Sequence, residues 1–127
     1  NQTILVVEDE AAVRAAAVTM LESLGYLCLE AADAGSALAL LQNGRDVDLV
    51  FTDVIMPGPL KTRDFADQVR AAAPDLPILF TSGYTENAIV HHGRLDEGMT
   101  LLSKPYARDD LARQVARMLL RAAPEGP

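Results

Sequence analysis

The chain alternates between short apolar runs and longer segments in which apolar residues recur every three or four positions. The apolar runs predict strands over residues 3–7, 26–30, 47–52, 77–81 and 100–103. The segments after them predict helices over residues 11–24, 63–73, 85–95 and 109–121, and a further helix that begins between Asp33 and Ser36 and ends at Gln42. The pattern is weakest over 85–95. Continuous apolar strands separated by helices indicate a parallel sheet covered on both faces, so we expect an α/β fold with five β-α units.

Local signals agree with these boundaries. Asp33 is a side chain suited to begin a helix, Gly25 and Gly44 are suited to end one, and Asp109 or Asp110 is suited to cap the last helix. The apolar positions of the helices form the predicted core faces, at Val13, Ala17, Met20, Leu21 and Leu24, at Phe65, Val69 and Ala72, and at Leu111, Val115, Met118 and Leu119.

Length and composition limit the class of protein. The 127 residues predict one domain over 1–127, with a core of about 3–121 and no effector domain. Eleven basic and eighteen acidic residues give a net charge of −7, which argues against non-specific nucleic-acid binding. Cys28 has no second cysteine to pair with and is interpreted as a reduced core residue. With no signal peptide and no apolar run of about 20 residues, we expect a cytoplasmic protein without membrane contact.

Polar residues follow four of the five predicted strands. Glu8 and Asp9 follow the first, Asp53 the third, Ser82 the fourth and Lys104 the fifth. Because sites of open α/β folds lie at the carboxyl ends of the strands, we expect these side chains to converge.

This set of residues makes chemical sense as one unit. Grouped carboxylates repel one another, and oxygen ligands with several waters suit Mg²⁺. Asp53 would then be a nucleophile of the aspartyl-phosphate kind, while Lys104 and Ser82 would contact phosphoryl oxygens. Phosphoryl transfer depends mainly on positioning and charge neutralisation, which such a set supplies.

Four motifs carry a family resemblance: VVEDE, FTDVIMPG, PILFTSG and LLSKPY, in this order. From Ile4 to about Leu120 the chain resembles the receiver domains of response regulators in two-component signalling. The resemblance implies a flavodoxin-like, doubly wound (βα)5 fold whose five-stranded parallel sheet has the order 2-1-3-4-5. It also implies a phosphoacceptor switch, not an enzyme with an external substrate, in a bacterial phosphorelay.

The resemblance assigns roles to individual residues. Asp53 matches the phosphoacceptor, Lys104 the phosphate-binding lysine and Ser82 the hydroxyl switch residue. Asp9 matches the direct ligand of Mg²⁺ (or Mn²⁺), Glu8 an acid that reaches the metal largely through water, and the backbone carbonyl of Ile55 a further ligand. The implied phosphodonor is a histidine kinase or a histidine phosphotransfer protein. The implied response is a change in the surface of the fourth helix, fifth strand and fifth helix, through which a homodimer is an open alternative.

One position, one loop and one longer segment depart from the family pattern. Leu101 replaces a frequent aromatic residue, which argues against an aromatic switch, and the loop at 59–63 lacks a usual glycine. Segment 84–100 resembles the variant in receivers attached to, or working beside, sensor histidine kinases. Apolar Ile55 and the ring of Tyr84 predict slow hydrolysis of the phosphoaspartate.

Two other functions remain to be weighed at this point. A small Mg²⁺-dependent phosphohydrolase usually needs a carboxylate two residues after its nucleophile, where this chain has Ile55. A flavodoxin-like ligand-binding domain would need a phosphate-cradling loop after the first strand, where the chain has three acidic residues. His91 and His92 lack a suitably spaced third ligand and are interpreted as solvated.

Overall fold

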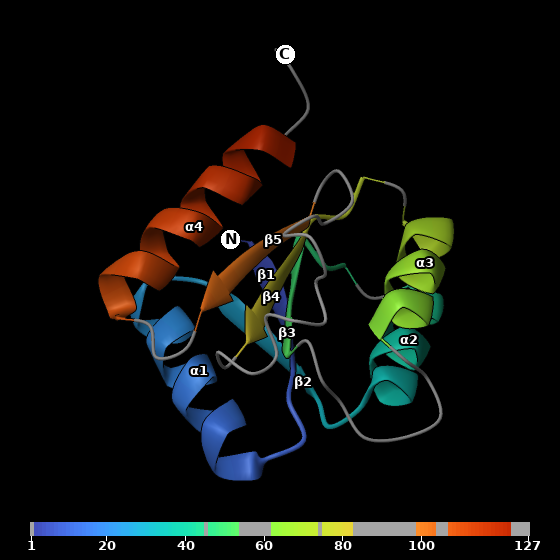
Figure 1. The fold of residues 1–127 in the computed structure, drawn as a ribbon, viewed down its shortest axis with the longest axis horizontal. Helices are drawn as coiled ribbons and strands as arrows, with labels where there is room; N and C mark the ends of the chain where they lie inside the picture. Colours follow the sequence, from blue (N-terminus) through green and yellow to red (C-terminus); the bar gives the residue numbers. More distant parts are fainter. Residues whose placement is uncertain are drawn as a thin grey trace.

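A parallel β-sheet lies at the centre of the fold, with its strands in the order β2-β1-β3-β4-β5 (Figure 1). The computed structural model describes residues 2–44, 46–53, 62–73, 75–82, 99–103 and 107–122. The strands are β1 (Thr3–Val7), β2 (Leu27–Ala31), β3 (Leu49–Asp53), β4 (Ile78–Ser82) and β5 (Met99–Ser103). All four described strand pairs are parallel, so the carboxyl ends of the strands meet at one edge.

Helices cover both faces of the sheet. The described helices are α1 (Ala11–Ser23), α2 (Ala34–Gln42), α3 (Thr62–Ala72) and α4 (Arg108–Ala122). Figure 1 shows α1 and α4 on one side of the sheet and α2 and α3 on the other. None of the described helices has the length and apolar character needed to cross a membrane.

Side-chain alternation along β1 divides the core between the two faces. Ile4 and Val6 pack with α1 and α4, whereas Leu5 and Val7 pack with α2 and α3. All four are at most 1% exposed, which is why this strand is a continuous apolar run. The predicted α/β class and parallel sheet are therefore confirmed. The predicted helix over 85–95 lies outside the described residues, as do residues 59–61 of the predicted loop.

The third and fourth strands extend one residue further than predicted, and the third begins later. Asp53 and Ser82 are the last residues of β3 and β4, paired with Thr81 and Ser103 respectively. The prediction that β3 begins at residue 47 is wrong. Asp48 instead lies beside the start of β1, where its carboxylate accepts a hydrogen bond from the backbone N–H of Thr3 at 2.7 Å.

Two predicted helix faces need correction. Val13 is 37% exposed, and Ala17 and Leu21 are the buried residues of α1. In α3, Phe65 and Val69 are buried as predicted, but Ala66 is buried in place of Ala72, which is exposed. The buried face of α3 therefore follows the i, i+1, i+4 positions of a helix.

The last helix begins before its two aspartates, so the prediction that one of them is its N-cap is wrong. Asp109 and Asp110 lie in the first turn of α4, where a negative charge favours the positive end of the helix dipole. The carboxylate of Asp110 accepts a hydrogen bond from the backbone N–H of Ala107 at 3.2 Å. The predicted apolar face of this helix, from Leu111 to Leu119, is buried as expected.

The predicted cap of α2 and the predicted glycine stops after α1 and α2 are confirmed, whereas α3 lies one residue earlier than the predicted 63–73. Asp33 caps α2 by accepting a hydrogen bond from the backbone N–H of Ser36 at 2.7 Å, and this bond lowers the pKa of its carboxyl group. Gly25 and Gly44 follow α1 and α2 with φ angles of 98° and 79°. This left-handed conformation favours glycine, which explains why the helices stop there.

The thiol of Cys28 is only partly buried, so its prediction as a core residue holds in part. It packs against the core on the α1 and α4 side. Burial, followed by the nearby charges of Glu22 and Glu30, raises the pKa of this thiol to about 11.

We expect slow alkylation of Cys28 by iodoacetamide in the folded protein, because the thiolate is the nucleophile. The rate of alkylation should rise with pH in step with the thiolate fraction, and should reach half of its maximum near pH 11. Since the unfolded chain loses this proton at lower pH, the thiol also makes stability fall as the pH rises from the unfolded pKa toward 11. The rate is measured by intact mass, with the urea-unfolded chain as the control. A plateau near the pKa of an ordinary thiol would contradict the prediction.

Phe65→Ala should destabilise the fold strongly, because Phe65 is fully buried between α3 and the sheet. Truncation of a buried phenylalanine costs about 3–5 kcal/mol through lost burial and the cavity that remains. Urea unfolding followed by circular dichroism measures the change. The control is Leu120→Ala, whose side chain is 79% exposed and whose effect should stay within about 0.5 kcal/mol.

Candidate functional site

The candidate site lies at the carboxyl ends of β1, β3 and β4. In the register of the sheet, Val7 pairs with Thr52 and Asp53 pairs with Thr81. Glu8 follows Val7 directly, so the residues at positions 8, 53 and 81 form one row across three neighbouring strands. This row unites residues that are far apart in the sequence, as the strand-end pattern predicted for Glu8 and Asp53.

Both predicted carboxylates of this row are buried. Glu8 is 6% exposed and Asp53 is 8% exposed. They line one small pocket together with Thr52, Thr81 and Val13, and residues of β1, β3 and α1 complete its wall. Val13 lines this pocket, which accounts for its partial exposure.

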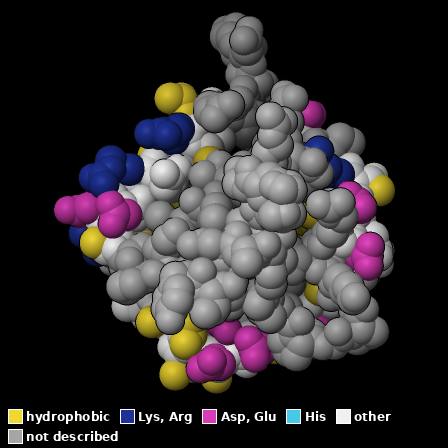
Figure 2. All heavy atoms as spheres, viewed as in Figure 1, with side chains coloured by type: hydrophobic (Ala, Val, Ile, Leu, Met, Phe, Trp, Pro, Cys, Tyr) yellow, Lys and Arg dark blue, Asp and Glu magenta, His cyan; other side chains and the backbone are white. Residues whose placement is uncertain are grey.

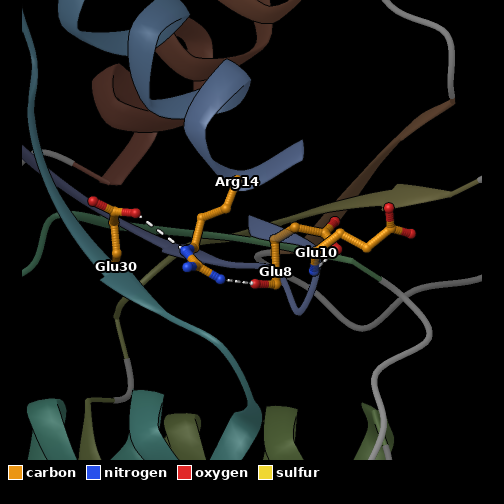
Figure 3. A network of polar contacts seen from close by, with 4 residues as sticks. All are labelled: Glu8, Glu10, Arg14 and Glu30. Atoms are coloured by element: carbon orange, nitrogen blue, oxygen red, sulfur yellow. Dashed lines mark hydrogen bonds and ion pairs between the residues drawn. The ribbon is translucent and has the colours of Figure 1, made fainter. Parts of the chain in front are cut away.

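The turn between β1 and α1 is held by hydrogen bonds on both sides of Glu8. The backbone N–H of Glu8 donates to the carbonyl of Ala31 at 3.0 Å, which extends the pairing of β1 with β2 by one residue. The carboxylate of Glu8 accepts from the backbone N–H of Glu10 at 3.1 Å (Figure 3). These bonds set where the three consecutive acids of the turn lie.

Asp9 differs from its neighbour, because it is exposed. Within the described part of the chain, no three His, Cys, Asp or Glu side chains are grouped as a metal site would require. The two buried carboxylates nevertheless supply the oxygen donors that a hard divalent cation prefers. The donor chemistry of the pocket thus fits Mg²⁺ or Mn²⁺, and the exposed Asp9 follows Glu8 directly in the chain.

The remaining predicted site residues are described only in part. Ser82 ends β4, one residue beyond the row, and its side chain lies outside the described residues, as does that of Leu101 in β5. Ile55 and Lys104 also lie outside them. The roles of Ser82, Ile55 and Lys104 therefore stay predictions.

Arg14 was missed by the sequence analysis. Its guanidinium donates from Nη1 to the carbonyl oxygen of Glu8 at 2.7 Å and from Nε to the Glu30 carboxylate at 3.1 Å (Figure 3). The sequence feature that could have indicated this role is the position of Arg14 in the first turn of the predicted helix, shortly after three consecutive acids. Thr81, which the sequence analysis left without a role, proves to be the backbone partner of Asp53.

Surface charge differs between the two ends of the view in Figure 2. Acidic side chains gather along its lower edge, where the N-terminal end of α1 lies in Figure 1, whereas basic and acidic side chains lie side by side over α4. The arrowheads of β4 and β5 also point toward that lower part of the view. The carboxyl ends of the strands thus lie toward an acidic part of the surface, which attracts cations.

Known proteins match this chain over almost its whole length. The sensor kinase CckA of Brucella abortus is 40% identical over 123 residues, which are 94% of this chain and 13% of that protein. The response regulator MprA of Mycobacterium sp. is 36% identical over 98% of this chain and 54% of that protein. The chain therefore spans about an eighth of the first relative and about half of the second.

A crystal structure of the receiver domain from the hybrid histidine kinase CckA superposes with a TM-score of 0.75 at 36% identity, and covers 92% of this chain and 98% of that domain. The receiver protein CpdR of Brucella abortus is 30% identical over 94% of this chain and 98% of its own length. Residues 4–116 match the profile of the response regulator receiver domain. This profile covers most of the chain and agrees with the fold and the strand-end motifs: the chain belongs to the response regulator receiver domain family.

Proposed function

We propose that this domain is a phosphoacceptor switch in a two-component phosphorelay, and that Asp53 accepts a phosphoryl group from the phosphohistidine of a histidine kinase or histidine phosphotransfer protein. The observation that carries the proposal is the pocket shared by the buried carboxylates of Glu8 and Asp53 at the carboxyl ends of β1 and β3. In the transfer, a carboxylate oxygen of Asp53 forms a bond to phosphorus. The phosphorus–nitrogen bond breaks, and its electron pair returns to the histidine ring of the donor.

The environment of Asp53 suits this role. Thr52 pairs with Val7 of β1, and Asp53 pairs with Thr81 of β4, so the aspartate is held at a fixed position on a rigid element. Its burial limits the water that could compete for the phosphoryl group. Phosphoryl transfer relies on such positioning more than on proton transfer.

The proposal includes a divalent cation, Mg²⁺ or Mn²⁺. Asp9, Asp53 and the carbonyl of Ile55 would hold it, and Glu8 would reach it largely through water. When bound, it neutralises negative charge between the carboxylates and the incoming phosphoryl group. Lys104 and Ser82 complete the proposed contacts to phosphoryl oxygens.

The proposed output is a change of surface, not turnover of an external substrate. The complete proposed fold is (βα)5, with a further helix between β4 and β5 and all five strands in order. Phosphorylation would alter the face formed by this further helix, β5 and α4, and thereby change affinity for a partner or a second copy of the chain. The domain assists its own phosphorylation and slow dephosphorylation, and we place it in the cytoplasm with its kinase. The similarity to the receiver domain of CckA makes a hybrid kinase one context for it.

Asp53→Asn should abolish phosphorylation, because an amide is not a competent nucleophile for this transfer. Purified protein is incubated with acetyl phosphate, with Mg²⁺ or with EDTA, and followed by intact mass. Wild type should gain one phosphoryl group only with the cation. The matched control is Asp67→Asn on the exposed side of α3, which should be labelled like wild type. Labelling of Asp53→Asn at another residue would discredit the assignment.

The phosphoaspartate should persist for minutes or longer in Mg²⁺ at room temperature, because apolar Ile55 cannot orient an attacking water and Tyr84 can shield the phosphoryl group. The decay of the phosphorylated mass after removal of acetyl phosphate measures the lifetime. Ile55→Asn, which adds a group that can hold water, should shorten it. A wild-type lifetime of seconds would refute the expected shielding.

A further inference from the structure

We infer that Arg14 is a positioning residue for the divalent cation: it holds the peptide between Glu8 and Asp9, and Glu30 holds Arg14. This inference rests on the proposed metal-dependent function and deepens it. Arg14 is not expected to contact the cation or the phosphoryl group. Its role is to fix the acidic turn against which the cation binds.

The geometry begins with the carbonyl of Glu8. This oxygen belongs to the peptide unit that joins Glu8 to Asp9, so its direction sets the direction in which the chain leaves β1. Arg14 Nη1 donates to it at 2.7 Å, the short distance of a charge-assisted hydrogen bond. The bond therefore constrains the backbone of both acids at once.

A second bond fixes the guanidinium itself. Arg14 Nε donates to Glu30 Oε1 at 3.1 Å, and Figure 3 shows the guanidinium lying between Glu30 and the turn. The planar fork of arginine thereby links α1, the end of β1 and β2. Only 20% of the Arg14 side chain is exposed, compared with 52% for Glu30, so the arginine is the more firmly enclosed partner.

The charges around the pocket explain why Arg14 forms an ion pair with Glu30. The turn holds three consecutive acids, and Asp53 lines the same pocket as Glu8. A cationic side chain offsets their repulsion, but an uncompensated positive charge near the pocket would also repel Mg²⁺. Glu30 neutralises Arg14, so the pair can orient the turn with little net charge of its own.

The helix provides the remaining constraint. The backbone N–H of Arg14 donates to the carbonyl of Glu10 at 2.8 Å, which places Arg14 one turn into α1 and above the acidic turn. The Glu10 N–H in turn donates to the carboxylate of Glu8. Glu8 is thus held through its carbonyl by Arg14 and through its side chain by Glu10.

The test measures metal affinity and stability separately. Mn²⁺ binding is titrated by electron paramagnetic resonance, and Mg²⁺ affinity follows from competition. The free energy of unfolding is measured with urea in EDTA. Arg14→Ala should weaken Mn²⁺ affinity about tenfold, because residues that orient metal ligands typically affect affinity by about 10- to 100-fold. Arg14→Lys, which keeps the charge but loses the fork, should weaken affinity less than Arg14→Ala. Glu30→Gln should cause a loss of less than about fivefold, in line with the contribution of exposed ion pairs.

The matched control is Arg113→Ala, which removes an arginine that pairs with Asp110 on α4. It should leave Mn²⁺ affinity unchanged. If Arg14→Ala does not fold, Arg14→Lys and Glu30→Gln carry the same comparison. Folded Arg14 variants that bind Mn²⁺ like wild type would overturn the inference, even if they are less stable. If wild type binds Mn²⁺ and is labelled on Asp53, unchanged affinity in the Arg14 variants contradicts only the role of Arg14. If wild type neither binds Mn²⁺ nor is labelled, the proposed function and this inference are refuted together.

Discussion

The parallel pairing of β1, β3 and β4 is the constraint on which the candidate site depends. A shift of one residue in this register would move Asp53 away from Thr81 and turn its side chain to the other face of the sheet. The register is in turn determined by burial, because Ile4 and Val6 must face α1 and α4 while Leu5 and Val7 face α2 and α3. The same packing that stabilises the core therefore positions the carboxylates.

The site places acidic groups where burial is unfavourable to them. Glu8 and Asp53 lie at the end of strands that are otherwise apolar, in a pocket between the sheet and α1. Buried charge is costly unless it is compensated by hydrogen bonds or opposite charge. The bonds from Glu10 to the carboxylate and from Arg14 to the carbonyl of Glu8 provide part of this compensation. A cation would provide more, which links the stability of this edge to the proposed function.

Family membership supports the general role of the domain, whereas the geometry of the pocket supports the roles of individual residues. Family membership rests on a profile match over residues 4–116 and on relatives that cover nearly the whole chain. It carries the general role of a receiver in two-component signalling. The proposed roles of Glu8 and Asp53 depend on the pocket that both residues line. The roles of Ser82, Ile55 and Lys104 depend on the sequence motifs and stay predictions.

The sequence by itself determined the α/β class, the parallel sheet and the strand ends that carry Glu8 and Asp53, because buried strands and amphipathic helices leave periodic patterns in the residues themselves. It did not determine where β3 begins: the strand starts at Leu49, and Asp48 before it is joined to distant Thr3 by a backbone and a side-chain hydrogen bond. It also did not reveal the exposure of Val13 or the role of Arg14. Both depend on which segments meet in space: a pocket lined by residues of β1, α1, β3 and β4, and a guanidinium that joins α1 to the end of β1 and to β2. Such contacts leave no local periodicity, so only the tertiary structure decided them.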